Sequence, residues 1–188
     1  MVLGRFFRKS PIKAAVLRLY HAVASQSRRP EFYLEAGVPD TVDGRFDLIL
    51  LNAFLVMHGL RRSPEKTDEF QQALFDEIFA HMDQSLREMG VGDARLGRQV
   101  KAMAEAFYGR VTAYEEGLAG GAGVLEDALR RNLYGTIDVS GTSVASMADY
   151  VRRQAGAMDS EMLRKVMVGQ IEFVAFYSRR GEPLPARG

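Results

Sequence analysis

The side chains best suited to chemistry in this sequence are its three histidines, His21, His58 and His81. They lie far apart in the chain, and only His81 has a carboxylate one helical turn away, at Glu77. A di-iron site in a helical bundle needs paired Glu-x-x-His elements, and the sequence has none. The absence of cysteine also excludes disulfides, thiolate catalysis and Cys-ligated metal centres. We therefore expect structural or surface histidines, no metal and no cofactor.

Other patterns linked to catalysis are missing as well. The sequence contains no G-x-S-x-G nucleophile motif, and its glycine-rich stretches at residues 90–92 and 120–123 lack the Lys-Ser/Thr of a phosphate loop. The acids Glu69, Asp76 and Asp83 fall on one helical edge with Arg87, which suits either a solvated edge or a partner-binding edge. These patterns identify no enzymatic activity.

These side chains must be positioned by helices, and the most prominent helical pattern spans residues 75–114. Apolar residues recur there at steps of three or four, at Phe75, Phe79, Met82, Leu86 and Met89, and again at Leu96, Val100, Met103, Phe107, Val111, Tyr114 and Leu118. Between the two runs, Gly90 suits a left-handed turn position, Val91 can pack back on the first helix, and Asp93 can cap the second. The spacing predicts a long antiparallel helical hairpin.

The rest of the chain is also patterned for helices. The expected helices span residues 11–29, 31–36, 45–62, 64–89, 94–119, 124–133, 143–158 and 160–177, with Asp40, Thr41 or Asp43 capping the third, and Ser143 and Ser160 capping the last two. Gly97 and Gly109 indicate close packing or a bend in the hairpin's second helix. Because no useful strand pattern appears, we predict an all-α fold, a single-domain helical bundle organised on the hairpin. Its parts are a basic arm (1–29), a helical domain (30–180) and a flexible tail (181–188).

The basic residues are concentrated at the start of the chain. Residues 1–30 contain seven Lys and Arg and no acid, although the formal net charge of the chain is +1. Lys13 and Arg18 interrupt the apolar core that a secretion signal needs, so the arm suits anionic lipid, RNA or organellar import instead. The expected membrane contacts are Arg5, Phe6, Phe7, Arg8 and Lys9. The uncharged run at 48–60 is shorter than the ~20 residues of a membrane-spanning helix and predicts a buried core helix.

Three short segments of the sequence, called the family words below, resemble a known family. GVPDTVDGRFDLILLN (37–52), REMGVGD (87–93) and EAFYGR (105–110) are similar to the ubiquinol–cytochrome c chaperone family, assembly factors for the respiratory cytochrome bc1 complex. The resemblance covers residues 30–135. It implies a non-catalytic chaperone that binds cytochrome b or an early bc1 intermediate near an anionic membrane surface, with a ribosome contact and no specific nucleic acid sequence. Its expected location is cytoplasmic and peripheral on the inner membrane, or the mitochondrial matrix side if the chain is organellar.

The family words and the helical edges together suggest where a partner binds. The expected partner-binding residues are Asp40, Arg45, Phe46, Asp83, Arg87, Glu88, Asp93, Lys101 and Tyr108. Two alternatives stay open at this point. One is a small helical lipid- or quinone-binding protein, or an enzyme, with an apolar pocket between helices. The other is an RNA or ribosome binder that acts through the basic arm.

Overall fold

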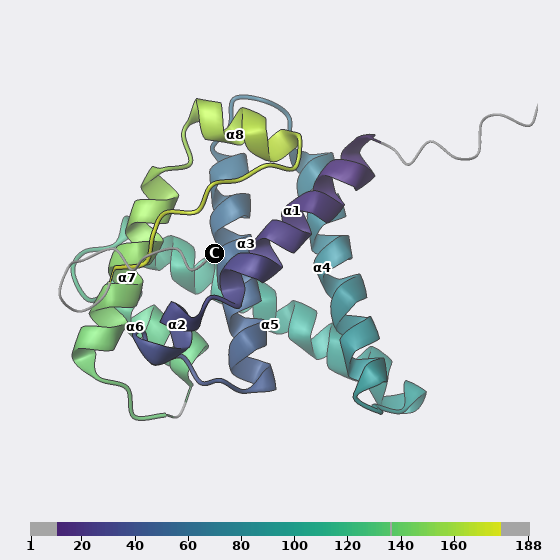
Figure 1. The fold of residues 1–188 in the computed structure, drawn as a ribbon, viewed down its shortest axis with the longest axis horizontal. Coiled ribbons are helices and arrows are strands. Elements are labelled where there is room, and N and C mark those ends of the chain that lie inside the picture. Colours follow the sequence, from purple (N-terminus) through teal and green to yellow (C-terminus); the bar gives the residue numbers. More distant parts are fainter. Residues whose placement is uncertain (1–10, 136, 178–188) are drawn as a thin grey trace, which may run out of the picture.

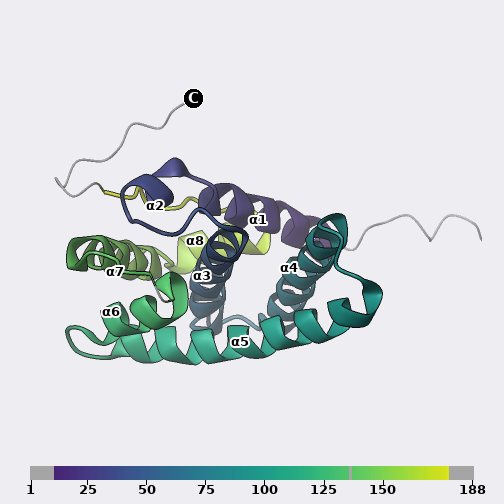
Figure 2. The same ribbon diagram turned by 90° about the horizontal axis from the view of Figure 1, so that it is seen from below.

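The computed structural model describes residues 11–135 and 137–177, and these residues form helices and contain no β-strand (Figures 1 and 2). The elements are α1 (Pro11–Ser27), α2 (Pro30–Leu34), α3 (Val42–Arg61), α4 (Asp68–Glu88), α5 (Asp93–Ala119), α6 (Val124–Leu129), a π-helical turn (Arg130–Tyr134), α7 (Gly141–Gly156) and α8 (Ser160–Met167). The predicted all-α fold is confirmed. The predicted membrane contacts at residues 5–9 and the tail at 181–188 lie outside the described residues.

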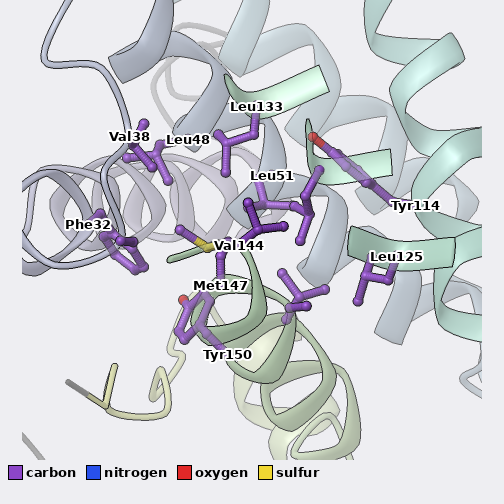
Figure 3. Close-up of a cluster of buried hydrophobic side chains, with 14 of the residues drawn as sticks. Phe32, Val38, Leu48, Leu51, Tyr114, Leu125, Leu133, Val144, Met147 and Tyr150 are labelled. Atoms are coloured by element: carbon purple, nitrogen blue, oxygen red, sulfur yellow. The ribbon is translucent and has the colours of Figure 1, made fainter. Parts of the chain in front are cut away.

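Helix α3 is the centre of the molecule. Every residue from 50 to 60 is buried, as the uncharged run predicts, and the surrounding helices pack on all of its sides (Figure 1). One half of the core lies between α3, α6 and α7, where Phe32, Leu51 and Met147 meet (Figure 3). The other half lies between α1, α3 and α4 and includes Leu50 and Phe70. The position of α3 is therefore fixed from both sides.

A buried polar network ties α1, α3 and α7 together. The Tyr150 hydroxyl donates to Asn52 Oδ1 at 2.8 Å and accepts from Gln26 Nε2 at 3.1 Å. Asn52 Nδ2 donates to Ser27 Oγ at 3.0 Å. Since buried polar groups are costly when unpaired, this network fixes how the three helices pack.

The predicted hairpin is formed by α4 and α5. Gly90 takes a left-handed conformation (φ +83°), and the Val91 N–H donates to the Leu86 carbonyl at 3.0 Å, which closes α4. The prediction that Asp93 caps α5 is wrong, because Gly92 holds the cap position and Asp93 is the first helical residue. From this turn the two helices diverge, and α5 runs on along α6 (Figures 1 and 2).

Two helix boundaries differ from the prediction because of contacts distant in sequence. Helix α4 begins at Asp68 rather than residue 64, since the Thr67 hydroxyl donates to the Leu60 carbonyl at 3.0 Å and holds the preceding turn against α3. Helix α8 ends at Met167 rather than residue 177. There Gly169 has φ +81°, and a Cβ at this position would collide with the backbone of Ala15. The chain then continues extended across α7.

Helix caps were predicted with mixed success. Thr41 caps α3 and accepts from the Gly44 N–H at 3.1 Å, as one of the three candidates. The predicted caps of the last two helices are wrong. Ser140 and not Ser143 caps α7, and Asp159 and not Ser160 caps α8. Of the two features predicted at Gly97 and Gly109, close packing or a bend, close packing is wrong, since a Cβ at either would meet nothing within 4 Å.

Candidate functional site

An open groove of about 360 Å3 lies where α4 and α5 diverge, with the C-terminal half of α3 beside it. We call it the α3–α4–α5 groove. Its lining residues are Met57 and Arg61 from α3, Asp68, Gln71, Gln72 and Phe75 from α4, and Phe107, Tyr108 and Val111 from α5. The volume is that of a few side chains, so the groove suits one segment of a larger partner as well as a small ligand.

The apolar part of the groove is aromatic. The rings of Phe75 and Tyr108 stack from α4 to α5, with centroids 5.5 Å apart and an interplanar angle of 26°. Phe107 is buried and lies 5.8 Å from the Phe75 ring. Tyr108 is 58% exposed, and its hydroxyl forms no hydrogen bond within the part of the chain that the structure describes. An exposed tyrosine on an aromatic support is a common anchor in protein interfaces.

The polar rim of the groove is acidic. Arg61 lies 3.0 Å from Glu115, so its charge is offset. Asp68 stands exposed in the first turn of α4, and Asp76 accepts from Gln72 Nε2 at 2.8 Å. Neither carboxylate forms an ion pair with any described residue. Asp68 in the lining and Asp76, the residue after Phe75, therefore carry negative charges that no ion pair offsets.

The histidines His58 and His81 make structural contacts and do not form a metal site. His58 is buried and pairs through Nδ1 with Glu115 Oε2 at 2.7 Å. His81 stacks on Tyr20, with ring centroids 4.0 Å apart. Within residues 11–135 and 137–177, no three His, Asp or Glu side chains come together as a metal-binding group. Both histidines have structural contacts, and His58 helps to fix Glu115 opposite Arg61.

A partly buried ion pair sets the position of α5 against α3. Arg110 Nη2 lies 2.8 Å from Asp47 Oδ1, and Arg110 Nε donates to the Asn132 carbonyl in the π-helical turn at 3.2 Å. Burial raises the pKa of Asp47 to about 6, although the charge of Arg110 lowers it. Val111, the residue after Arg110, lines the groove. The Asp47–Arg110 ion pair therefore positions one wall of the groove.

The predicted hairpin residues come together at the α4–α5 turn. Arg87 bridges two carboxylates, with Nε 2.7 Å from Asp83 Oδ2 and Nη1 2.8 Å from Asp93 Oδ1. Glu88 lies next to them and accepts from Gln84 at 2.9 Å. All of these groups except Asp83 are exposed, and Asp83 is partly exposed. Arg87 therefore links the last turn of α4 to the first residue of α5.

The remaining predicted residues are distributed over other surfaces. Arg45 Nε lies 2.6 Å from Asp40 Oδ1 at the start of α3, and this hydrogen bond lowers the pKa of Asp40. Phe46 packs partly buried against the core, while Lys101 pairs with Glu105 at 3.8 Å on α5. No described ion pair joins these groups to the hairpin turn, although α3 begins and α4 ends on the same side of the molecule (Figure 1). Among the predicted residues, Tyr108 lines the groove.

Comparison with known proteins places this geometry in a family. The family model described as "Ubiquinol-cytochrome C chaperone" matches residues 34–173. The chain belongs to this chaperone family. The match extends well beyond residue 135, where the sequence resemblance ends, and it includes α7, α8 and most of the extended segment.

Relatives of this chaperone are assembly factors in eukaryotes. It is 23% identical over 154 residues to "Ubiquinol-cytochrome-c reductase complex assembly factor 1" of Xenopus laevis, covering 82% of this chain and 77% of that protein. It is 25% identical to the Homo sapiens protein of the same description, and 29% identical to "Protein CBP3, mitochondrial" of Saccharomyces cerevisiae. The matches cover 82% and 76% of this chain, but 52% of the human protein and 44% of the yeast one.

The fold is shared with a solved structure. The crystal structure of the Cbp3 homolog from Brucella abortus superposes with a TM-score of 0.76 at 31% sequence identity. The alignment covers 87% of this chaperone chain and 91% of that chain. Within the residues described here, no helix is both long enough and apolar enough to cross a membrane.

Two of the three family words lie at the groove and at the α4–α5 turn. EAFYGR contains Phe107 and Tyr108 of the groove and Arg110 of the buried ion pair, and REMGVGD forms the α4–α5 turn. Sequence reasoning missed the α3 and α4 sides of the groove. Its one usable signal was Tyr108, because the neighbouring Phe107 follows the core spacing and so leaves Tyr108 toward solvent.

Proposed function

We propose that this protein is a non-catalytic assembly chaperone that binds cytochrome b, or an early intermediate of the cytochrome bc1 complex, in the α3–α4–α5 groove. The observation that supports this most is the exposed Tyr108 ring stacked on the partly buried Phe75 in a member of the chaperone family. The protein held by the chaperone is called the client below. Membership of the family supports a role in bc1 assembly, and the groove supports a role in binding apolar surface.

The groove meets the physical demand of such a client. A membrane protein that has not yet assembled exposes apolar side chains to water, and burying them contributes about 25 cal/mol per Å2. Phe75 gives the groove an apolar lining together with Met57, which is only 5% exposed, and Tyr108 adds an amphipathic ring. Because a stable interface usually buries ~1,200–2,000 Å2 in total, we expect the groove to be its centre and not its full extent.

The exposed charges at the α4–α5 turn are proposed as a second contact with the client or with an assembly partner. Arg87, Asp83 and Asp93 form a surface network in a family word, and the helices around it need only their apolar stripes to fold. Reversing the charges at Asp83 and Arg87 should therefore leave the melting temperature nearly unchanged. If that variant unfolds, the network is structural.

The alternative of a lipid or quinone carrier has one observation in its favour. The groove volume of about 360 Å3 lies within the range of small-ligand pockets, but ligand sites usually enclose most of the ligand, and this groove is open. The effect of Tyr108→Ala on quinone binding distinguishes the two functions. The carrier is favoured if a quinone binds the purified protein, if Tyr108→Ala weakens that binding, and if the same substitution leaves the amount of co-isolated cytochrome b unchanged.

The proposed function is tested by isolating the tagged protein from the membrane fraction of its cells. Tyr108→Ala should lower the cytochrome b that is co-isolated by about tenfold, because an interface hot spot contributes more than 1.4 kcal/mol. The matched control is Leu34→Ala at the end of α2, where the side chain is 79% exposed but lies outside the groove. Both variants should keep the melting temperature of the unmodified protein.

Three results would contradict parts of the proposal. Normal co-isolation with Tyr108→Ala removes the groove as the binding site. If only the variant with reversed charges at Asp83 and Arg87 loses the co-isolated cytochrome b, the site lies at the α4–α5 turn. Absence of cytochrome b from every isolate would remove cytochrome b as the client.

We propose a peripheral location on the cytoplasmic or matrix face of the inner membrane, held by the basic arm. Each basic residue near an anionic surface contributes ~1 kcal/mol, and residues 1–30 carry seven of them. Sedimentation with anionic vesicles should fall with added salt and with removal of residues 1–9. Equal sedimentation of the full-length and shortened chains would contradict this.

A further inference from the structure

We infer that the α3–α4–α5 groove selects one class of client segment, the end of a transmembrane helix where an apolar run is followed by lysine or arginine. This inference rests on the proposed function and specifies what the groove recognises. It is drawn from three features of the site, which are its size, its aromatic lining and the sign of its rim charge.

The size and lining fit one face of a helix. A volume of about 360 Å3 accepts a few side chains and excludes a folded domain. Amphipathic or apolar helices bind grooves through anchors at i, i+3, i+4 and i+7, which is a set of this size. Phe75 and Tyr108 offer such anchors apolar contact without directional hydrogen bonds, so the apolar part of the site is tolerant of sequence.

The rim charge supplies the selection. Arg61 is the cation of the groove lining, and its charge is offset because it pairs with Glu115 at 3.0 Å. Asp68 and Asp76 on the α4 side have no ion-pair partner among the described residues. A cation placed beside the groove therefore meets attraction, and an anion meets repulsion, within the ~8 Å screening length at physiological ionic strength.

Transmembrane helices combine the two features that the groove recognises. Their apolar runs end on the cytoplasmic side in loops enriched in lysine and arginine. A helix end of this kind can place apolar side chains on Phe75 and Tyr108 while its basic flank reaches Asp68 or Asp76. The opposite end of the same helix lacks the basic flank, so the groove distinguishes the end on its own side of the membrane.

The test uses two short synthetic peptides with the same apolar run and one tryptophan, one ending in lysines and the other in glutamates. The protein contains no tryptophan, so the fluorescence of the peptide reports binding without background. The lysine peptide should bind the full chain at least about tenfold more tightly at low salt, and the difference should shrink at high salt.

The variant Asp68→Asn/Asp76→Asn should reduce this preference to within a few-fold. Asp138→Asn, an exposed carboxylate outside the groove, should leave it unchanged.

The outcomes separate this inference from the proposed function. If both peptides bind equally and Tyr108→Ala weakens both, the groove binds apolar segments without charge selection. The inference is then overturned, and the proposed function stands. If neither peptide binds and Tyr108→Ala leaves cytochrome b isolation normal, both are overturned. If the preference appears but survives Asp68→Asn/Asp76→Asn, these two carboxylates are not its source, and the inference fails on that ground.

Discussion

Replacing Asp47 with asparagine should expose a pH dependence of stability that arises at one partly buried ion pair. The two side chains are only 16% (Asp47) and 21% (Arg110) exposed, and their closest charged atoms are 2.8 Å apart. Burial raises the pKa of Asp47 from 3.8 to about 6, because the lost hydration of the carboxylate outweighs the attraction of Arg110. The folded chain therefore holds this proton more tightly than the unfolded chain.

The size and sign of the effect follow from this difference. A pKa difference of about 2 between the folded and unfolded chains corresponds to about 3 kcal/mol of unfolding free energy. The contribution is fully present below pH 3.8 and is lost as the pH rises through about 6. Asparagine does not titrate, so the stability of the unmodified protein relative to Asp47→Asn should fall by about that amount between about pH 4 and pH 7.

Urea unfolding at a series of pH values measures this effect. The difference in unfolding free energy between the two proteins is plotted against pH, because groups common to both cancel in the difference. Asp138→Asn is the control for removing a carboxylate from the surface. A flat difference curve would refute the reasoning. A curve that rises with pH would show that the attraction of Arg110 outweighs the loss of hydration.

Three further substitutions test the packing. Gly97→Ala should raise the unfolding free energy by up to about 1 kcal/mol, because its Cβ meets nothing within 4 Å and alanine favours the helix; an unchanged or lower urea midpoint would contradict this. Gly59→Ala should lower the urea midpoint, since its Cβ would lie 2.8 Å from the Cβ of Met158; a stabilised protein would contradict the buried contact. Tyr150→Phe should cost about 1–3 kcal/mol in thermal or urea unfolding, because it leaves buried partners of the hydroxyl unpaired, and a neutral result would mean that the network repairs itself.

Local sequence patterns predict most of the helices, because spacing of apolar residues and turn chemistry act over a few residues. The buried run of α3 and the left-handed Gly90 are confirmed for this reason. Two of the helix ends that differ, the start of α4 and the end of α8, are set by contacts distant in sequence. Thr67 is held by the Leu60 carbonyl, and Gly169 must approach the backbone of Ala15, and neither constraint is visible in the local pattern.

The candidate site was predicted less completely than the fold. Tyr108 is a surface candidate because the neighbouring Phe107 takes the core position, whereas the helical spacing of Phe75 assigns that residue to the core. Phe75 does pack partly buried against the core, but it also lines the groove, which its spacing does not indicate. A residue on the inner stripe of a hairpin is buried only where the partner helix is near, and periodicity does not report that distance.

The groove exists because the two helices of the hairpin are held by different parts of the molecule. Helix α4 packs mainly against α1, whereas α5 packs mainly against α6. At Gly117 a Cβ would lie 2.9 Å from the Cα of Leu125, so α5 and α6 approach as closely as glycine allows, and Arg110 holds α5 to Asp47 of α3. Near the turn, by contrast, Leu96 is buried while most side chains of residues 95–106 are exposed. A hairpin packed along its whole length would cover Phe75 and Tyr108 and leave no groove; separate attachment of its two helices keeps this aromatic surface open to a partner.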